Sequence, residues 1–155
     1  MAQNRKFQDF VENKYMADDA IGNSETDKNQ SKMLVFDFDG SSLDVGAVTL
    51  TAADGVTAQT IPANAILKSW FIDVTDAFTS AGSATLALGI TGTADALVGA
   101  TAFNNAALVA ATAGWEFASK GAKTDGAKSV IATIGTAALT AGRFKLYIEY
   151  VEVTV

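Results

Sequence analysis

The amino-acid sequence predicts an all-β fold, an antiparallel β-sandwich or jelly roll with an extended N-terminal arm that contains a short helix. Ala84, Leu86, Leu88 and Ile90 alternate with smaller or polar residues, the period of two expected of a strand with one buried face. Similar short apolar runs recur between turns rich in Gly, Ser, Asn and Asp, and no helical crossovers are evident between them. With 155 residues, 49% of them hydrophobic, the chain can form one core.

A change in charge density divides the chain into an arm, residues 1–33, and a body, residues 34–155. The arm holds 5 basic and 6 acidic residues, which is 11 of the 28 charged residues of the chain. Its second half, from Asp18 to Lys32, has one large apolar side chain, Ile21, and cannot bury enough surface to fold alone. We therefore expect this half of the arm to be a linker.

The first half of the arm carries an amphipathic pattern. Phe7, Phe10, Val11 and Tyr15 fall at helical spacing, and charged residues occupy the other faces. The pattern predicts a short helix over about residues 6–16. An arm of this composition is either a disordered tail or an anchor held by a neighbour. We expect the anchor, in which these four residues dock on another subunit.

Two strands are expected next, followed by a third that ends at the only proline of the chain. The first is a largely apolar run, the second alternates apolar residues with Thr, and the third stops at Pro62, where a ladder hydrogen bond can be spared. The strands are residues 33–38, 45–52 and 56–61, and the turns between them are residues 39–42 and 54–55.

The rest of the body is expected to complete about eight strands. The expected strands are residues 65–74, 83–90, 128–134 and 142–155, and the expected turns are residues 79–83 and 123–126. The Ala-rich residues 95–102 and 106–111 suit short helices as well as strands, and residues 115–118 suit a loop or a short strand. In the last strand the apolar positions change parity after Tyr150, which implies a bulge or a strand covered on both sides.

Aromatic and acidic residues of these strands have structural interpretations. Trp70 and Phe71 lie among apolar residues, where aromatic side chains are more often part of the core than platforms on which a sugar stacks. Tyr147 and Tyr150 should lie on opposite faces of the final strand, so one of them is available to an interface. Asp73 and Asp76 are expected to flank a solvated turn, although acidic residues at this spacing are also candidate metal ligands.

Composition excludes several function classes. The chain has no His and no Cys, which removes disulfides, thiol nucleophiles, most zinc sites and the Ser-His-Asp triad. A net charge of −6 and a pI near 4.5 argue against a nucleic-acid partner. Polar residues interrupt the small apolar residues 94–114, and residues 1–16 lack the apolar run of a secretory signal. We expect a protein that is not an enzyme, needs no cofactor or metal, and binds neither nucleic acid nor membrane.

One motif is similar to a catalytic motif. Residues 35–44, VFDFDGSSLD, resemble the first motif of the haloacid-dehalogenase-like phosphatases, in which a strand ends in Asp-x-Asp-Gly-Thr. The resemblance implies that Asp37 is the nucleophile and Asp39 the general acid and base, with a magnesium ion close by. That family also needs a doubly wound α/β core and a later acidic pair, and neither pattern is found here. We therefore interpret the motif as a strand followed by a turn, and a calcium site formed by Asp37, Asp39 and Asp44 as a weaker option.

A second resemblance covers much of the body. It is similar to small virion proteins of tailed bacteriophages, especially capsid decoration (cement) proteins such as those of cyanophage-like particles. The segments that carry the resemblance are IPANAIL (61–67), IDVTDAF (72–78), GSATLALG (82–89) and LTAGRF (139–144).

The second resemblance implies a jelly-roll-like module that assembles as a homotrimer or homodimer on the outer face of a phage head. There it would bind the major capsid protein, bridge neighbouring coat subunits and belong to the virion, which is assembled in the host cytoplasm. Independently, 18% charged residues and a mean hydropathy of +0.22 indicate that partners cover part of its surface. The alternative is a tail or head-fibre module that binds a host glycan through loops at one end of the sandwich, and a phosphatase using Asp37 and Asp39 comes third.

Overall fold

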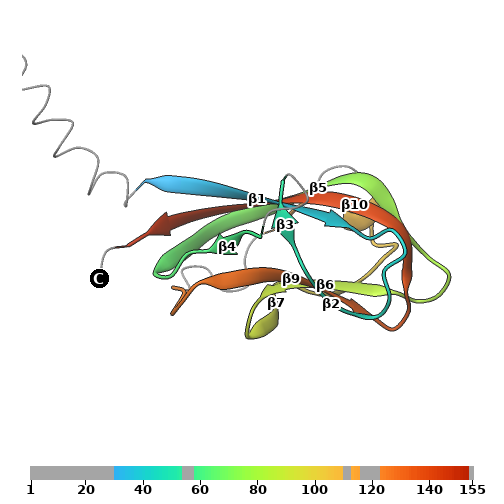
Figure 1. The fold of residues 1–155 in the computed structure, drawn as a ribbon. Helices are drawn as coiled ribbons and strands as arrows, with labels where there is room; N and C mark the ends of the chain where they lie inside the picture. Colours follow the sequence, from blue (N-terminus) through green and yellow to red (C-terminus); the bar gives the residue numbers. More distant parts are fainter. Residues whose placement is uncertain (1–29, 54–57, 110–112, 116–122, 154–155) are drawn as a thin grey trace, which may run out of the picture.

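The computed structural model describes residues 30–53, 58–109, 113–115 and 123–153, which form a β-sandwich of two facing sheets (Figure 1). We call the sheet with the strand order β3-β1-β10-β5-β8 sheet A, and the sheet with the order β2-β9-β6-β7, to which β4 is added by pairing with β9, sheet B. The strands of sheet A are β1 (Ser31–Asp39), β3 (Thr51–Ala52), β5 (Ala65–Ser80), β8 (Ala113–Trp115) and β10 (Leu139–Glu152). The strands of sheet B are β2 (Gly46–Thr49), β4 (Thr60–Ile61), β6 (Thr85–Ile90), β7 (Thr93–Ala102) and β9 (Lys128–Gly135).

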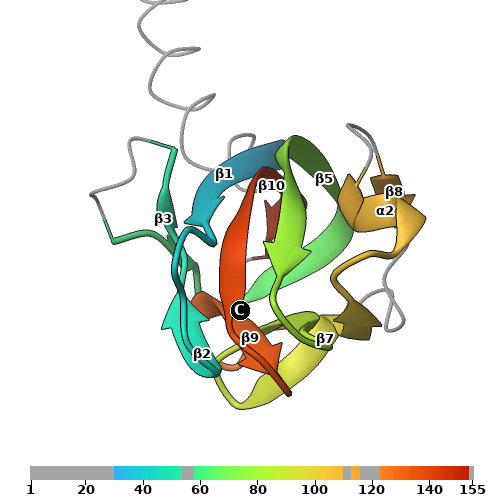
Figure 2. The ribbon, with the colours of Figure 1, turned by 90° about the vertical axis from the view of Figure 1, so that its right-hand side faces the viewer.

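Every strand pair in the described residues is antiparallel. The predicted all-β antiparallel sandwich is therefore confirmed. One helical turn, α2 (Ala106–Val109), lies beside β5 together with β8 (Figure 2), and its Leu108 is buried against the core. The predicted arm helix lies outside the described residues.

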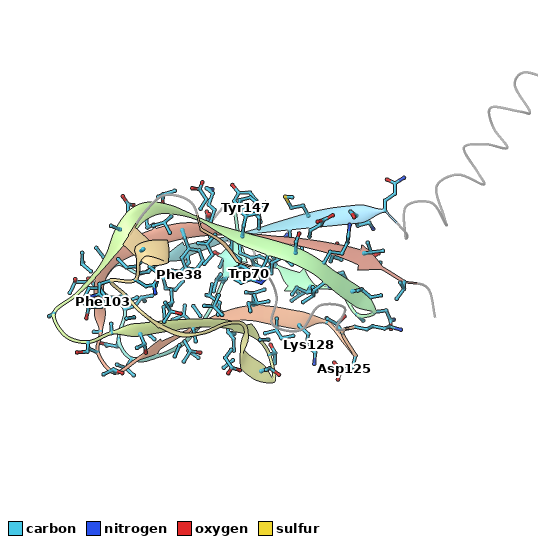
Figure 3. The ribbon with its side chains drawn as sticks, turned by 180° about the vertical axis from the view of Figure 1, so that it is seen from behind. Phe38, Trp70, Phe103, Asp125, Lys128 and Tyr147 are labelled. Atoms are coloured by element: carbon cyan, nitrogen blue, oxygen red, sulfur yellow. The ribbon has the colours of Figure 1, made fainter. Side chains whose placement is uncertain are left out.

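The core lies between the two sheets and is almost entirely apolar. The inward residues alternate with outward residues along β9 and β10, as the sequence predicted. Figure 3 shows Phe38 and Trp70 in the space between the layers. At one end of the core, Phe144 stacks on Phe38 with ring centroids 4.8 Å apart, and Phe78 lies 6.0 Å from both rings. Such a cluster contributes both buried area and favourable ring geometry to stability.

The predicted strand 45–52 is wrong in one respect, because it is two strands in different sheets. β2 pairs with β9 in sheet B, and β3 pairs with β1 in sheet A. The chain crosses between the layers at Leu50, which is 2% exposed and whose amide donates to the carbonyl of Val130 at 2.9 Å. A residue that passes between two sheets buries its side chain without breaking the alternation, so the sequence gives no sign of the crossing.

The strand predicted at 65–74 extends to Ser80, and its pairing with β10 has four register shifts. Opposite β10, Glu149 pairs with Ser69 and Tyr150 pairs with Leu67, so Lys68 is an extra residue on β5. A second register shift leaves Thr75 between the paired Val74 and Asp76. The sequence predicted a bulge in the last strand near Tyr150, or a strand covered on both sides. The register does shift between Glu149 and Tyr150, but the extra residue is on β5, and β10 keeps its alternation through Tyr150. Asp73 and Asp76 lie within β5, so the turn predicted between them is wrong.

Most of the remaining expectations are met with shifted boundaries, but of the predicted strand 56–61 only Thr60 and Ile61 form a strand in the described residues. The strands predicted at 33–38, 83–90, 128–134 and 142–155 correspond to β1, β6, β9 and β10. The chain leaves β4 at Ile61, directly before Pro62. Of the ambiguous segments, residues 95–102 belong to β7, and residues 106–109 form α2. Residues 54–57 and 116–118, which include a predicted turn and part of a predicted loop, lie outside the described residues.

Candidate partner-binding face

The outward face of sheet A is the most chemically varied surface of the described chain. Antiparallel pairing places outward side chains of β1, β10 and β5 in rows across the sheet. The central row is Val35, Tyr147 and Phe71, and Met33 of β1 lies one row away beside Glu149. We call Met33, Val35, Phe71 and Tyr147 the apolar strip.

An aromatic stack forms the middle of the apolar strip. The rings of Phe71 and Tyr147 lie 4.4 Å apart and 4° from parallel. Figure 3 shows Tyr147 on the outer side of its sheet, while Trp70, the neighbour of Phe71, points inward. Phe71 is 38% exposed and Met33 is 57% exposed, which makes them two of the three large hydrophobic residues exposed in the described chain. Exposed aromatic and Met side chains with a polar rim are typical of protein–protein interfaces.

One end of the apolar strip is bordered by a hydrogen-bonded cluster around Glu149. Lys68, the bulge residue, donates to Oε1 of Glu149 at 2.8 Å and to the hydroxyl of Ser31 at 2.6 Å. Ser69 donates to the second carboxylate oxygen at 2.8 Å. The hydrogen bond from Lys68, assisted by those from the two serines, lowers the pKa of Glu149 to about 2. The bulge therefore brings a cation and a hydroxyl to the same carboxylate.

The opposite end carries the acidic residues that the phosphatase resemblance singled out. Lys145 lies 3.2 Å from Asp37, and Arg143 lies 2.7 Å from Asp39 and 3.9 Å from Asp76. Hydrogen bonds from Ser41, followed by the nearby Arg143, lower the pKa of Asp39. These side chains border a shallow hollow of about 380 Å³, lined by Asp37, Phe38, Asp39, Thr51, Thr75, Arg143, Phe144 and Lys145.

This arrangement differs from that expected of a phosphatase. The motif lies on β1, which pairs antiparallel with both β10 and β3, whereas the resemblance requires a doubly wound core. Asp37 and Asp39 each form an ion pair with a cation of β10. In residues 30–53, 58–109, 113–115 and 123–153, no three acidic residues are grouped closely enough to hold a metal ion, so the calcium option has no site there.

A second hollow of about 450 Å³ lies at the end of the sandwich where β6 turns into β7. It is lined by Leu67, Ile90, Thr91, Gly92, Thr93, Lys123, Thr124, Asp125 and Lys128. Lys128 and Asp125 form an ion pair at 2.6 Å, and Figure 3 shows both at this end of the molecule. The buried Thr124 hydroxyl donates to the Pro62 carbonyl at 2.7 Å and accepts from the Ala65 amide at 2.9 Å, which fixes the loop.

The outward face of sheet B is chemically different. The outward positions of β2, β6 and β9 carry small or uncharged side chains: Ala47, Thr49, Thr85, Ala87, Gly89, Ser129, Ile131, Thr133 and Gly135. The backbone of β7 crosses close to Gly89, where a Cβ would overlap Ala94. These outward positions of β2, β6 and β9 therefore carry no charge, whereas the outward face of sheet A carries ion pairs and the exposed aromatic stack.

The predicted site residues and the observed face only partly coincide. Phe7, Phe10, Val11 and Tyr15 lie outside the described residues, so their role stays a prediction. Tyr147 and Tyr150 lie on opposite faces of β10, as predicted: Tyr147 faces outward and Tyr150 is buried.

Phe71 was expected in the core, and this is wrong. It neighbours the buried Trp70 and shares the parity of the outward Asp73. Its parity relative to Trp70, Ile72 and Val74 is the signal that could have identified it, since only alternate residues of a strand face one side.

The fold is similar to chains in three solved bacteriophage capsids. In the acidic stable capsid of Helicobacter pylori bacteriophage KHP30, the match covers 79% of this chain and 89% of that chain, with a TM-score of 0.54 and 14% identity. A chain of the cyanophage Pam1 capsid asymmetric unit matches with a TM-score of 0.53 and 17% identity, over 81% of this chain and 87% of that one. A chain of the Ralstonia phage GP4 capsid matches with a TM-score of 0.53 and 17% identity, over 81% of this chain and 86% of that chain.

At this identity the similarity demonstrates a shared fold. No protein-family model matches the chain, and no curated protein matches it by sequence. The described residues include no helix with the length and apolar character needed to cross a lipid bilayer.

Proposed function

We propose that this chain is a structural protein of a bacteriophage virion, and that it acts as a capsid decoration (cement) protein on the outer face of the head. The observation that carries the proposal is the fold shared with chains of three phage capsids over 79–81% of this chain. A fold alone does not fix a function, so the proposal also depends on the surface.

The outward face of sheet A supports a role in binding other proteins. An exposed aromatic stack lies between two ends where acidic side chains already have hydrogen-bonding partners. The acidic residues that a phosphatase would use as nucleophile and acid form ion pairs on this face. The chemistry of the face therefore suits contact with a partner, without turnover of a substrate.

The proposed mechanism is stabilisation by linkage. A protein that binds the assembled shell and not its dissociated subunits lowers the free energy of the shell by RT ln(1 + [L]/Kd), about 2.7 kcal/mol per site at a concentration of 100 Kd. If one molecule contacts two coat subunits, the first contact raises the effective concentration of the second. We infer that the partners are the major capsid protein and further copies of this chain, as a homotrimer or homodimer, on particles assembled in the host cytoplasm.

Immunogold electron microscopy of phage particles that carry this gene tests the location. Antibodies raised against the purified chain should label the head surface at many positions, and particles from a deletion phage are the control. Labelling confined to a tail tip or to head fibres would overturn the decoration role in favour of the glycan-binding alternative, for which the hollow beside Lys123 and Lys128 is the candidate. Particles without label would overturn both roles.

Adding the purified chain back to heads of the deletion phage tests the mechanism. We expect the temperature at which the heads release DNA to rise and to saturate with protein concentration. Phe71→Ser should weaken the effect, because it removes half of the exposed stack, while Ala47→Ser on sheet B should not. Heads whose stability does not change at saturating protein would contradict stabilisation by linkage.

A further inference from the structure

We propose that the apolar strip of sheet A is the docking surface for the arm of a neighbouring copy, with residues 6–16 lying across it. The inference rests on the proposed function in one respect, that copies of this chain assemble side by side. The inference identifies the surface that binds the arm, whereas the sequence predicts only that the arm binds another subunit. Two complementary surfaces on one chain, an arm and a face, are the requirement for a ring in which each copy binds the next.

Apolar chemistry matches on the two sides. The arm presents Phe7, Phe10, Val11 and Tyr15 at helical spacing. The face presents the four residues of the apolar strip, including a parallel aromatic stack and a Met that is 57% exposed. An amphipathic helix with anchors at such spacing commonly binds by laying its apolar face on an apolar surface. Met and aromatic side chains adapt well to such a contact.

The charges around the strip also match the arm. At the end with the 380 Å³ hollow, the face has four acidic residues (Asp37, Asp39, Asp73, Asp76) and two basic residues (Arg143, Lys145), a net charge of −2. Asp73 forms no ion pair within the described part of the chain. Arm residues 1–17 have three basic residues (Arg5, Lys6, Lys14) and two acidic residues (Asp9, Glu12), a net charge of +1. The surplus carboxylates can thus pair with the basic residues beside Phe7.

The linker is long enough for the arm of one copy to reach the apolar strip of a neighbouring copy. The described chain begins at Gln30, and the next residue, Ser31, lies on β1, the strand that carries Met33 and Val35 of the strip. The 13 residues from 18 to 30 can span roughly 43 Å when extended, at about 3.3 Å per residue. Three adjacent strands are only about 10 Å across. The arm therefore leaves from the edge of the face, and its tether can reach the same face on a neighbour.

Disulfide trapping in the full-length protein tests this contact, because the natural chain has no cysteine. One chain carries Val11→Cys in the arm, and a second, mass-tagged chain carries Met33→Cys on the strip. The matched control replaces the second chain with Ala47→Cys, which is exposed on the outward face of sheet B. Under mild oxidation, we expect the disulfide-linked heterodimer to form at least about tenfold faster with Met33→Cys than with Ala47→Cys, because docking raises the effective concentration.

Two outcomes would overturn the inference. The first is equal rates with the Met33→Cys and Ala47→Cys chains. The second is a combination of two results: the doubly substituted Val11→Cys, Met33→Cys chain forms an intramolecular disulfide at high dilution, and the two singly substituted chains form no heterodimer when they are mixed. That combination would show that the arm binds the apolar strip of its own chain. Adding Phe71→Ser to the Met33→Cys chain should lower the rate while strand content stays unchanged by circular dichroism, since Phe71 is outside the core.

The trapping experiment needs no phage particles, so it separates this inference from the proposed function. If trapping fails while antibodies label the head, the arm binds another surface and the decoration role stands. If trapping succeeds while no particle is labelled, the copies assemble as proposed here and the decoration role is wrong.

Discussion

Gly142 lies where β10 bends against the aromatic end of the core, and no larger residue fits there. Its φ of +133° lies in a region that L side chains rarely adopt, and a Cβ would fall 2.6 Å from Cγ of Phe78. Its carbonyl also accepts the amide hydrogen of Gly40 at 2.7 Å, which fixes the turn after β1. A single glycine thus links the backbone of β10 to the packing of Phe78 and to the end of β1.

We expect Gly142→Ala to destabilise the fold by about 2–4 kcal/mol, the sum of overpacking and backbone strain. The midpoint of thermal unfolding should fall by roughly 5–15 °C. Gly99→Ala on β7 is the control, because a Cβ there meets nothing within 4 Å and should change stability by less than about 0.5 kcal/mol. Equal midpoints for the two variants in circular dichroism melts would contradict the packing described for Gly142.

Glu149 should make stability depend on pH. The pKa of its carboxylate in the folded chain is about 2, below the usual 4.5, mainly because Lys68 donates a hydrogen bond to it. The unfolded chain therefore binds more protons between these values, and the stabilisation is complete above about pH 4.5 and is lost as the pH falls toward 2. The group is exposed, so solvent screening keeps the effect small.

We expect Glu149→Gln to flatten the dependence of the unfolding midpoint on pH between about 4.5 and 2. Urea unfolding at several pH values in this window measures it. Asp95→Asn is the control, since it removes a carboxylate that forms no ion pair in the described part of the chain. If the curves of Glu149→Gln and the natural chain run parallel, the Lys68 contact does not act on the folded state as the structure indicates.

Strand β5 shows how a bulge preserves a buried pattern. Leu67 and Trp70 both face the core, although two outward residues, Lys68 and Ser69, separate them. Deleting either Lys68 or Ser69 restores strict alternation, and the residues before and after the deletion still point to the same side of sheet A. A deletion at a regular position has the opposite effect, because it turns every following side chain to the other face.

Deleting Lys68 should therefore give a folded protein of reduced stability, and deleting Asp73 should give an unfolded one. Asp73 lies between the buried Ile72 and Val74, so its loss forces one of them outward or shifts the rest of β5. Far-ultraviolet circular dichroism and thermal melts of the two deletion variants measure this difference. Cooperative folding of the Asp73 deletion with natural stability would show that the register of β5 is not fixed by its buried face.

The sequence predicted those elements whose side chains alternate cleanly, and failed where the backbone changes sheet or register. β6, β9 and β10 alternate large apolar residues with small or polar ones, so their existence and faces were predictable. β7 is rich in Ala and Gly, whose small side chains carry a weak signal for any element. The second half of β5 was missed because Thr75, Asp76 and Ala77 are all exposed around a bulge.

At the scale of the whole molecule, the two faces of the sandwich divide its surface by chemistry. Sheet A presents the aromatic stack and several ion pairs, and the outward positions of β2, β6 and β9 in sheet B present uncharged, mostly small residues. This division was not predictable in full, because it depends on which strands are neighbours. Tyr147 and Tyr150 were expected on opposite faces of the last strand, but Phe71, the partner of the outward Tyr147, comes from a strand more than 70 residues earlier in the chain. Long-range pairing formed the candidate face, whereas the arm pattern is local, so a prediction about the arm can be made from the sequence without knowing the fold.

The arm and the body should make separable contributions to assembly. Deleting residues 1–29 removes no residue of the described strands, so the unfolding midpoint of the sandwich should change by only a few degrees. Binding to heads of a deletion phage, measured by co-sedimentation, should weaken at least about tenfold, because a tethered second contact can raise avidity by about 10²–10⁴. A chain in which residues 18–29 are replaced by a Gly/Ser linker of equal length is the control and should bind like the natural chain, since the tether needs only reach. A chain without residues 1–29 that binds heads as tightly as the full chain would show that the body alone carries the interaction.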